Sequence, residues 1–241
     1  MKTVKKERFK KLKELKDIIL KKKLEVAVAV FLGITTLLVA WAGWIGSLHG
    51  GIQAINFTES NNLASEGNSA YNVAAQIYMS DLFAWNSIFN LQLDMDAARA
   101  KGNAEEVKLI ETKIDKIKKS SCSPILLDAL NSTSVKDGAS PFENEAFSKK
   151  YFEEPERLIN ESQRVLEEGK QDNLRGDSYR LVSVIYSLVL FLLGIVGVIK
   201  DYQSRKVLFI FSVCILLVGI IYMLTLPMPT GFDLGSFFGV K

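Results

Sequence analysis

Three uncharged apolar stretches dominate the pattern of hydrophobic and polar residues along the chain. They cover residues 26–48, 181–199 and 207–226, and none of them contains Asp, Glu, Lys, Arg or His. A helix needs ~20 apolar residues to cross the hydrocarbon layer of a bilayer, so each stretch is long enough to span it. The pattern predicts an all-α membrane protein with three transmembrane helices and a helical bundle at residues 49–180, between the first and second spans.

Charged residues are distributed unevenly around these stretches. Residues 1–25 carry eleven Lys or Arg and four Asp or Glu, residues 200–206 have a net charge of +2, and residues 49–181 have a net charge of −6. Basic segments beside a span are retained in the cytoplasm. We therefore expect a cell-membrane protein whose N-terminus and 200–206 turn are cytoplasmic, and whose residues 49–180 and tail at 227–241 are extracytoplasmic. The basic residues expected at the membrane surface are Lys10, Lys11, Lys21, Lys22, Lys23, Lys200, Arg205 and Lys206.

The first span is expected to remain as an uncleaved signal anchor, because the apolar core of a signal peptide is only ~7–15 residues long. Before it, apolar residues recur on one helical face of the lysine-rich segment 5–23. This segment is either an amphipathic helix that lies on anionic lipid or a cytoplasmic extension of the first membrane helix. After the span, His49-Gly50-Gly51 predicts a helix end or a kink.

Residues 61–100 lack proline and predict one long helix, in which Gly67 is a weak point. Aromatic residues recur on it every seven positions, and aliphatic residues widen the apolar face. This stripe is interpreted as a packed core, with a ligand-binding groove or an interaction surface as the alternative. Its candidate residues are Tyr71, Tyr78, Leu82, Trp85 and Phe89.

The rest of the region before the second span is also expected to be mainly helical. A turn at 101–103 precedes a helix at 104–119, which Asn103 and Glu106 start with a capping box. A short helix is predicted at 125–130, and an irregular segment at 131–151 is predicted to hold a short helix near 143–151. A last long helix begins near Glu154-Pro155 and runs into the second span, with a bend near Gly176.

Seven residues, 200–206, join the second and third spans, so these spans should form a tight antiparallel hairpin. Pro227 and Pro229 are expected to end the third helix, and Phe232, Phe237 and Phe238 suggest that the tail rests at the membrane interface.

The sequence contains no motif for catalysis, a cofactor or a metal ion. It has no Gly-rich phosphate loop, no HExxH, no CxxC and only one histidine. The spans lack the ionisable residues that ion pathways usually contain, which disfavours a single-copy transporter or channel. We expect no enzyme activity, no cofactor and no nucleic-acid binding, and we expect Cys122 and Cys214 to form no disulfide with each other.

Three Asn-x-Ser/Thr sequons lie in the region expected outside the cytoplasm, which makes them possible N-glycosylation sites. The acceptor residues are Asn56, Asn131 and Asn160.

A short motif, Ser80-Asp81-Leu82-Phe83-Ala84-Trp85, and the hairpin at 181–226 carry a resemblance to a known family. The chain resembles an uncharacterised prokaryotic family of integral membrane proteins with a domain of unknown function. That family has one N-terminal span, a helical extracytoplasmic insert and a C-terminal hairpin of two spans. The chain departs from its pattern at Phe83, where Trp is expected, and in the polar loop at 131–151. The resemblance implies this architecture but no activity, cofactor or binding residue.

Three hypotheses for function follow from the sequence. The first is a non-catalytic membrane protein that acts through assembly, as a homo-oligomer or as an accessory subunit of a larger complex. The second is a membrane sensor that binds a ligand among the aromatic residues of the helical region. The third is an oligomeric channel. The partners expected in the first case are the lipid bilayer and other copies of the chain or other membrane-protein subunits.

Overall fold

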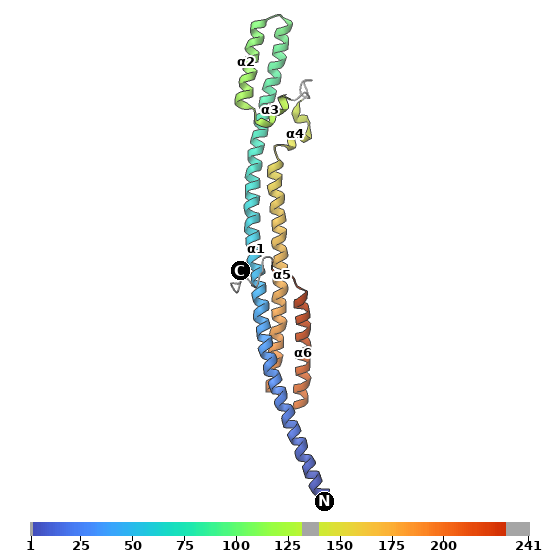
Figure 1. Cartoon of the computed structure of the whole chain (residues 1–241). Helices are drawn as coiled ribbons and strands as arrows, with labels where there is room; N and C mark the ends of the chain where they lie inside the picture. Colours follow the sequence, from blue (N-terminus) through green and yellow to red (C-terminus); the bar gives the residue numbers. More distant parts are fainter. Residues whose placement is uncertain (1, 132–139, 230–241) are drawn as a thin grey trace, which may run out of the picture. The chain divides into compact units, whose positions relative to one another are not determined.

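The computed structural model describes residues 2–131 and 140–229, with side chains from residue 18 onward, and these residues form an all-α fold (Figure 1). Six α-helices and one 3-10 helix make up this part of the chain, which contains no strand. In chain order the elements are α1 (Lys2–Ala100), α2 (Ala104–Ser121), α3 (Pro124–Asn131), η2 (Pro141–Glu143), α4 (Glu145–Lys149), α5 (Glu153–Val198) and α6 (Tyr202–Thr225).

The chain divides into two compact units. Unit 1 consists of Met1–Asn56 and Glu167–Lys241, and unit 2 consists of Phe57–Leu166, so that α1 and α5 contribute to both. Three helices, α1, α5 and α6, are long and apolar enough to cross a membrane, which suggests a multi-pass membrane protein. The three apolar stretches identified in the sequence lie in these helices, within unit 1.

In unit 1, α1, α5 and α6 lie side by side (Figure 1). Their buried positions follow a seven-residue repeat, which is the period of helices that pack along a seam as in a coiled coil. The buried residues are Val28, Thr35, Ala42 and His49 in α1; Asp172, Tyr179, Tyr186 and Leu193 in α5; and Arg205, Ser212 and Gly219 in α6.

Small residues let the helices of unit 1 approach closely. A Cβ atom on Gly46 would lie 3.3 Å from the Gly176 carbonyl oxygen, and one on Gly219 would lie 2.8 Å from Cε1 of Tyr186. One of the two predictions for His49-Gly50-Gly51, a helix end, is wrong, because α1 is helical through all three residues. Glycine costs only about 1 kcal/mol per helical position, so two glycines do not by themselves end a long helix.

The hairpin of α5 and α6 is confirmed and is tighter than predicted, because only residues 199–201 separate the two helices. The Asp201 carboxylate caps α6 by accepting hydrogen bonds from the Ser204 backbone N–H at 2.8 Å and the Ser204 hydroxyl at 2.7 Å. These bonds hold the pKa of Asp201 below its usual range. α6 ends at Thr225, as the following prolines predicted. The aromatic residues of the tail lie outside the described residues.

In unit 2, α2 folds back against the end of α1 after a turn in which Gly102 has a φ of +69°. The capping box is confirmed: Asn103 Oδ1 accepts from the Glu106 backbone N–H at 3.2 Å, and Asn103 Nδ2 donates to the Glu106 carboxylate at 2.9 Å. An apolar cluster joins the two helices; its buried members are Ile88, Ala98, Ile110 and Ile114.

A second cluster of unit 2 is aromatic and lies between α1, α3, η2, α4 and the segment that enters α5. Its buried members are Ala84, Trp85, Leu126, Phe147 and Tyr151. The short helix predicted near 143–151 is present as α4, whereas residues 132–139 of the predicted irregular segment lie outside the described residues.

Candidate functional site

The aromatic stripe predicted on residues 71–89 is largely covered within unit 2. Trp85 is 4% exposed, and the Tyr78 ring lies 5.2 Å from that of Phe142 and 5.3 Å from that of Tyr151. Tyr71, which is half exposed, packs against Phe152 at 5.0 Å. Leu82 and Phe89 are partly buried. These contacts match the interpretation of the stripe as packed core.

Asp81 forms a buried polar site beside this core and is 1% exposed. Its carboxylate accepts hydrogen bonds from the Ser123 backbone N–H at 2.8 Å, from the Ser123 hydroxyl, and from the Tyr151 hydroxyl at 2.8 Å. Three neutral donors from two other segments thus hold one carboxylate. Because a buried carboxylate is stable only when its oxygens are hydrogen-bonded, this site ties α1 to the start of α3 and to the end of α4.

The surroundings of Asp81 also change two neighbouring pKa values. Burial, followed by the hydrogen bond to Asp81, raises the pKa of Tyr151. Burial, followed by the negative charge of Asp81, raises the pKa of Cys122, so this thiol stays protonated and is a poor nucleophile at neutral pH. Cys122 and Cys214 are both free, as expected.

His49 and Asp172 form the buried polar site of unit 1. Nδ1 of His49 lies 3.0 Å from Oδ1 of Asp172, and Nε2 of His49 lies 3.2 Å from the Pro227 carbonyl oxygen. His49 is completely buried, and the Asp172 side chain is 5% exposed. Arg175 Nη1 lies 3.4 Å from the same carboxylate oxygen. The site therefore joins α1, α5 and the segment that follows α6.

Sequence reasoning missed both buried sites, although the seven-residue spacing contains a signal for the second one. Asp172 is the one acidic residue in a row that repeats every seven positions and is otherwise apolar: Leu158, Val165, Asp172, Tyr179, Tyr186 and Leu193. His49 follows Val28, Thr35 and Ala42 at the same spacing. A polar residue inside an apolar row of this kind is expected to find a buried partner.

The basic residues predicted at the membrane surface divide into two groups. Lys21, Lys22, Lys23, Lys200 and Lys206 are exposed, whereas the side chains of Lys10 and Lys11 lie outside the described residues.

Arg205 differs from that prediction because it is only 8% exposed, and its Nη1 pairs with Oε1 of Glu25 at 3.3 Å. It lies in the first turn of α6, on the buried row, so the helix points it toward α1 rather than outward.

The three sequon asparagines lie on helices. Asn131 and Asn160 are exposed, and Asn56 is half buried. Glycosylation of these residues stays a prediction.

One exposed face of α1 within the apolar stretch consists entirely of small residues, spaced alternately four and three positions apart. The hydroxyl of Thr36 on this face donates to the Leu32 carbonyl of the same helix at 2.8 Å, so it is satisfied without water. The neighbouring exposed face carries the larger Val30, Ile34 and Leu37. The residues of the small face are Ala29, Gly33, Thr36, Ala40, Gly43 and Ser47.

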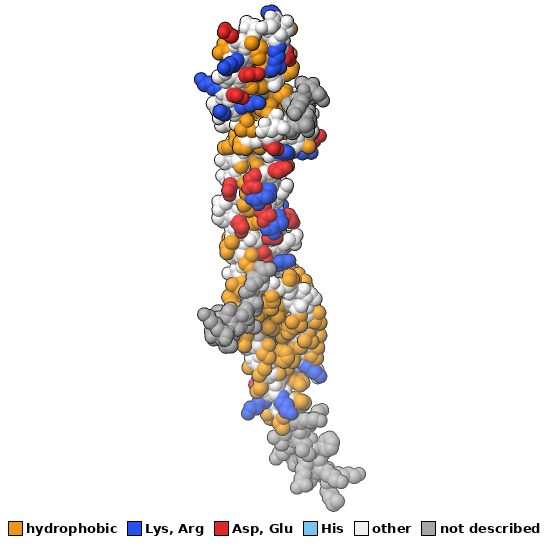
Figure 2. Space-filling model, turned by 45° about the horizontal axis from the view of Figure 1, so that its top comes forward, with side chains coloured by type: hydrophobic (Ala, Val, Ile, Leu, Met, Phe, Trp, Pro, Cys, Tyr) orange, Lys and Arg blue, Asp and Glu red, His pale blue; other side chains and the backbone are white. Residues whose placement is uncertain are grey.

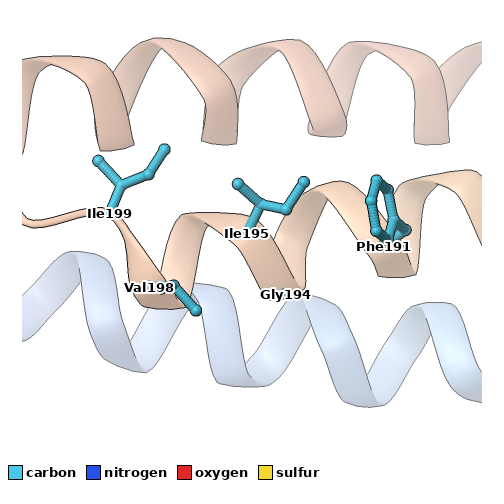
Figure 3. A pocket seen from close by; sticks show the side chains of 5 residues that line it. All are labelled: Phe191, Gly194, Ile195, Val198 and Ile199. Carbon is cyan, nitrogen blue, oxygen red and sulfur yellow. The ribbon is translucent and has the colours of Figure 1, made fainter.

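A shallow apolar groove of about 610 Å³ lies along the end of α5, lined by Phe191, Gly194, Ile195, Val198 and Ile199 (Figure 3). Figure 3 shows Ile195 and Ile199 projecting to one side of α5 and Val198 to the other. Figure 2 shows hydrophobic side chains over the surface of unit 1, with Lys and Arg at one end. A groove without polar groups in such a surface suits lipid acyl chains. In the part of the chain that the structure describes, no three His, Cys, Asp or Glu side chains gather as a metal site would require.

Comparison with known proteins adds no relative. No protein-family profile matches the chain, and neither a curated protein nor a solved structure matches it. What is established is the class: an all-α chain with three helices that are long and apolar enough to cross a membrane. The resemblance stated from the 80–85 motif and the hairpin stays a prediction.

Proposed function

We propose that this chain is a non-catalytic integral membrane protein that acts through assembly with further copies of itself or with other membrane subunits. In this proposal the N-terminus and the α5–α6 turn lie in the cytoplasm. Residues 49–180 and the C-terminus lie outside it, with unit 2 as an extracytoplasmic helical domain.

The observation that supports assembly most directly is the small-residue face of α1. In lipid there is no hydrophobic driving force between helices, so association depends on close packing, which Gly, Ala, Ser and Thr permit. The face carries only these residue types over Ala29–Ser47, and within the described chain it is exposed. Its four-and-three spacing is the one that lets a second helix pack along it.

The orientation rests on charge. Exposed Lys21, Lys22 and Lys23 precede the apolar part of α1, and Lys200 and Lys206 flank the α5–α6 turn, so both basic groups are placed on the cytoplasmic side by the positive-inside rule. The acidic balance of residues 49–181 fits the opposite side.

A ligand-binding role for the rings of unit 2 and a catalytic role for Asp81 receive less support. A ligand pocket would need the aromatic rings of unit 2 to face open space, but Tyr78 and Trp85 contact other rings. A catalytic role for Asp81 would need access to it, but three donors and surrounding side chains enclose its carboxylate.

Light scattering on the full chain, purified in a mild detergent and in nanodiscs, tests assembly. We expect a particle with more protein mass than one chain of 26.9 kDa. A strictly monomeric particle with no co-purifying protein would contradict the proposal.

A matched pair of variants tests the role of the small face. A Cβ atom on Gly33 or on Gly197 would meet no atom within 4 Å, so leucine fits at both positions of one chain. Gly33→Leu should convert the particle to one chain, whereas Gly197→Leu, on exposed α5, should leave its mass unchanged.

A further inference from the structure

We infer that His49 is a proton-dependent clamp that holds the segment after α6 against α1 and α5. This inference does not depend on assembly, because all the groups involved belong to unit 1 of one chain. It rests on what the two ring nitrogens face: a carboxylate oxygen of Asp172 at 3.0 Å and the Pro227 carbonyl oxygen at 3.2 Å.

Both of these partners are hydrogen-bond acceptors. A neutral imidazole has one N–H and one nitrogen with a lone pair, whereas the imidazolium has two N–H groups. Only the protonated ring can therefore donate to Asp172 and to Pro227 together. In the neutral ring, one nitrogen lone pair faces an oxygen lone pair, and an unpaired acceptor on this fully buried ring is unfavourable.

When the ring becomes neutral, the nitrogen that loses its proton is Nε2, which faces the Pro227 carbonyl oxygen. Asp172 is charged and accepts the stronger, charge-assisted bond, so the remaining N–H of a neutral ring stays on Nδ1. Arg175 also lies 3.4 Å from Asp172, so this carboxylate keeps a cationic partner after His49 loses its charge. Nε2 then faces the Pro227 carbonyl without a proton.

The remaining groups around the ring do not replace this bond. The Tyr179 ring stacks on that of His49 with centroids 5.8 Å apart, and its hydroxyl reaches the Leu226 and Pro227 carbonyls only at 3.4 Å. Arg180, whose guanidinium lies near Gly50, is paired with Asp177 at 2.8 Å. From the segment that follows α6, the Pro227 carbonyl oxygen is the group that contacts His49.

The direction of the pH effect follows from these contacts. The closed clamp contains the extra proton, so lowering the pH favours closure and raising it through the range in which histidine titrates favours release of the segment at Pro227. The consequence is that the attachment of Pro227 to α1 and α5, at His49 and Asp172, depends on pH.

The chain contains a single histidine, so isotope labelling reports on this site alone. Full-length protein with ¹⁵N-labelled histidine, in nanodiscs of phosphatidylcholine and phosphatidylglycerol, would be titrated from about pH 5 to 9. We expect both nitrogens to be protonated at the acid end, and only Nδ1 at the alkaline end. A ring that keeps one protonation state throughout would overturn the inference.

A distance measurement connects protonation to the clamp. Spin labels would be placed at Met228→Cys and Leu174→Cys, both exposed positions of unit 1, in a Cys122→Ala/Cys214→Ala background. We expect a narrow distance distribution at acid pH that broadens with the same midpoint as the histidine signal. An unchanged distribution, despite titration of the ring, would also overturn the inference.

Variants complete the test. His49→Gln cannot gain a charge and should remove the pH dependence of the distance, while circular dichroism checks that the helices are retained. Asp172→Asn should move the midpoint of the histidine signal to lower pH, because the carboxylate no longer stabilises the imidazolium. Glu167→Gln, at an exposed position of α5 whose carboxylate pairs with Lys170, should change neither readout.

Discussion

Among the residues whose side chains the structure describes, each of the two units buries one carboxylate, and the two carboxylates have different partners. Asp81 of unit 2 is held by the neutral donors of Ser123 and Tyr151, whereas Asp172 of unit 1 is held by the ionisable His49 and by Arg175. Neutral donors keep their protons over the physiological pH range, so the Asp81 site is a fixed structural joint. The partners of Asp172 include an imidazole, and in the inferred clamp its protonation is the feature that lets this site respond to pH.

The packing around the two sites differs as well. Asp81 adjoins aromatic rings that interlock edge to face, while Asp172 lies on a seam where Gly46 and Gly176 let two helices approach closely. The comparison teaches that one helix, α1, can contribute to a rigid joint through Asp81 and to an adjustable one through His49. Whether a buried carboxylate forms a rigid or an adjustable joint depends on whether its partners are neutral donors or an ionisable group.

The largest effect is expected from removing the fixed joint. Asp81→Ala leaves the Ser123 N–H and the Tyr151 hydroxyl buried without an acceptor, which should lower the free energy of unfolding of unit 2 by about 3 kcal/mol or more. Trp85 lies in unit 2, so its fluorescence in a Trp41→Phe/Trp44→Phe background reports on that unit during denaturant unfolding. Asp94→Ala, at an exposed position of α1, should cost no more than about 0.5 kcal/mol. If Asp81→Ala and Asp94→Ala lowered the free energy of unfolding equally, the Asp81 site would not be a joint that stabilises unit 2.

The next largest effect on stability is expected where α1 and α5 approach closely at Gly46 and Gly176, near Asp172. Gly46→Leu forces side-chain atoms against the Gly176 carbonyl and Tyr179, and overpacking of this kind costs about 1–3 kcal/mol. Thermal unfolding in detergent, followed by circular dichroism, should show a lower Tm. Gly197→Leu is the control, because a Cβ atom there meets no atom within 4 Å and the variant should leave the Tm unchanged. A normal Tm for Gly46→Leu would contradict the proposed seam.

Several elements of this comparison could be predicted from the sequence, because they depend on local patterns. The three apolar stretches, the cap at Asn103 and the helix ends near Pro227 each follow from residues that are adjacent in sequence. The Asp81 and His49 sites could not be found in the same way, since Asp81 meets Ser123 and Tyr151 from 42 and 70 positions away. Gly50 and Gly67 misled the sequence reading because glycine predicts a helix end or a weak point unless the partner helix is known. Gly67, for example, lies against Leu158 and Ile159.

A smaller effect is expected when one donor of the fixed joint is removed. Tyr151→Phe deletes one of the three bonds to Asp81 and should cost about 1 kcal/mol at neutral pH, measured by the same Trp85 unfolding assay.

This variant also tests the pH response of the joint. Because the pKa of Tyr151 is raised in the folded chain, folding keeps the phenol protonated where the unfolded chain ionises it, at about pH 10 in short peptides. The stabilisation is fully present below about pH 10 and falls as the pH rises further. The alkaline loss of stability should be smaller in Tyr151→Phe; an identical pH profile would argue against a titrating Tyr151.

The smallest effect is expected at a purely local contact. Asn103→Ala removes the cap of α2 and should cost about 0.5–1 kcal/mol. Hydrogen exchange of the first turn of α2 should rise while that of the Asp81 region stays unchanged. A loss of protection at both places would mean that the fixed joint depends on α2 and is not independent of it.

The proposed assembly is tested most directly inside native membranes. A photoreactive diazirine amino acid would be placed at Ala40, on the small face of α1, and in a second variant at Leu37, on the neighbouring exposed face. After illumination, we predict a protein adduct of defined mass at Ala40, with about twice the mass of one chain if the partner is a second copy, and only lipid adducts at Leu37. Lipid adducts alone at both positions, or the same protein adduct at both, would contradict the proposal.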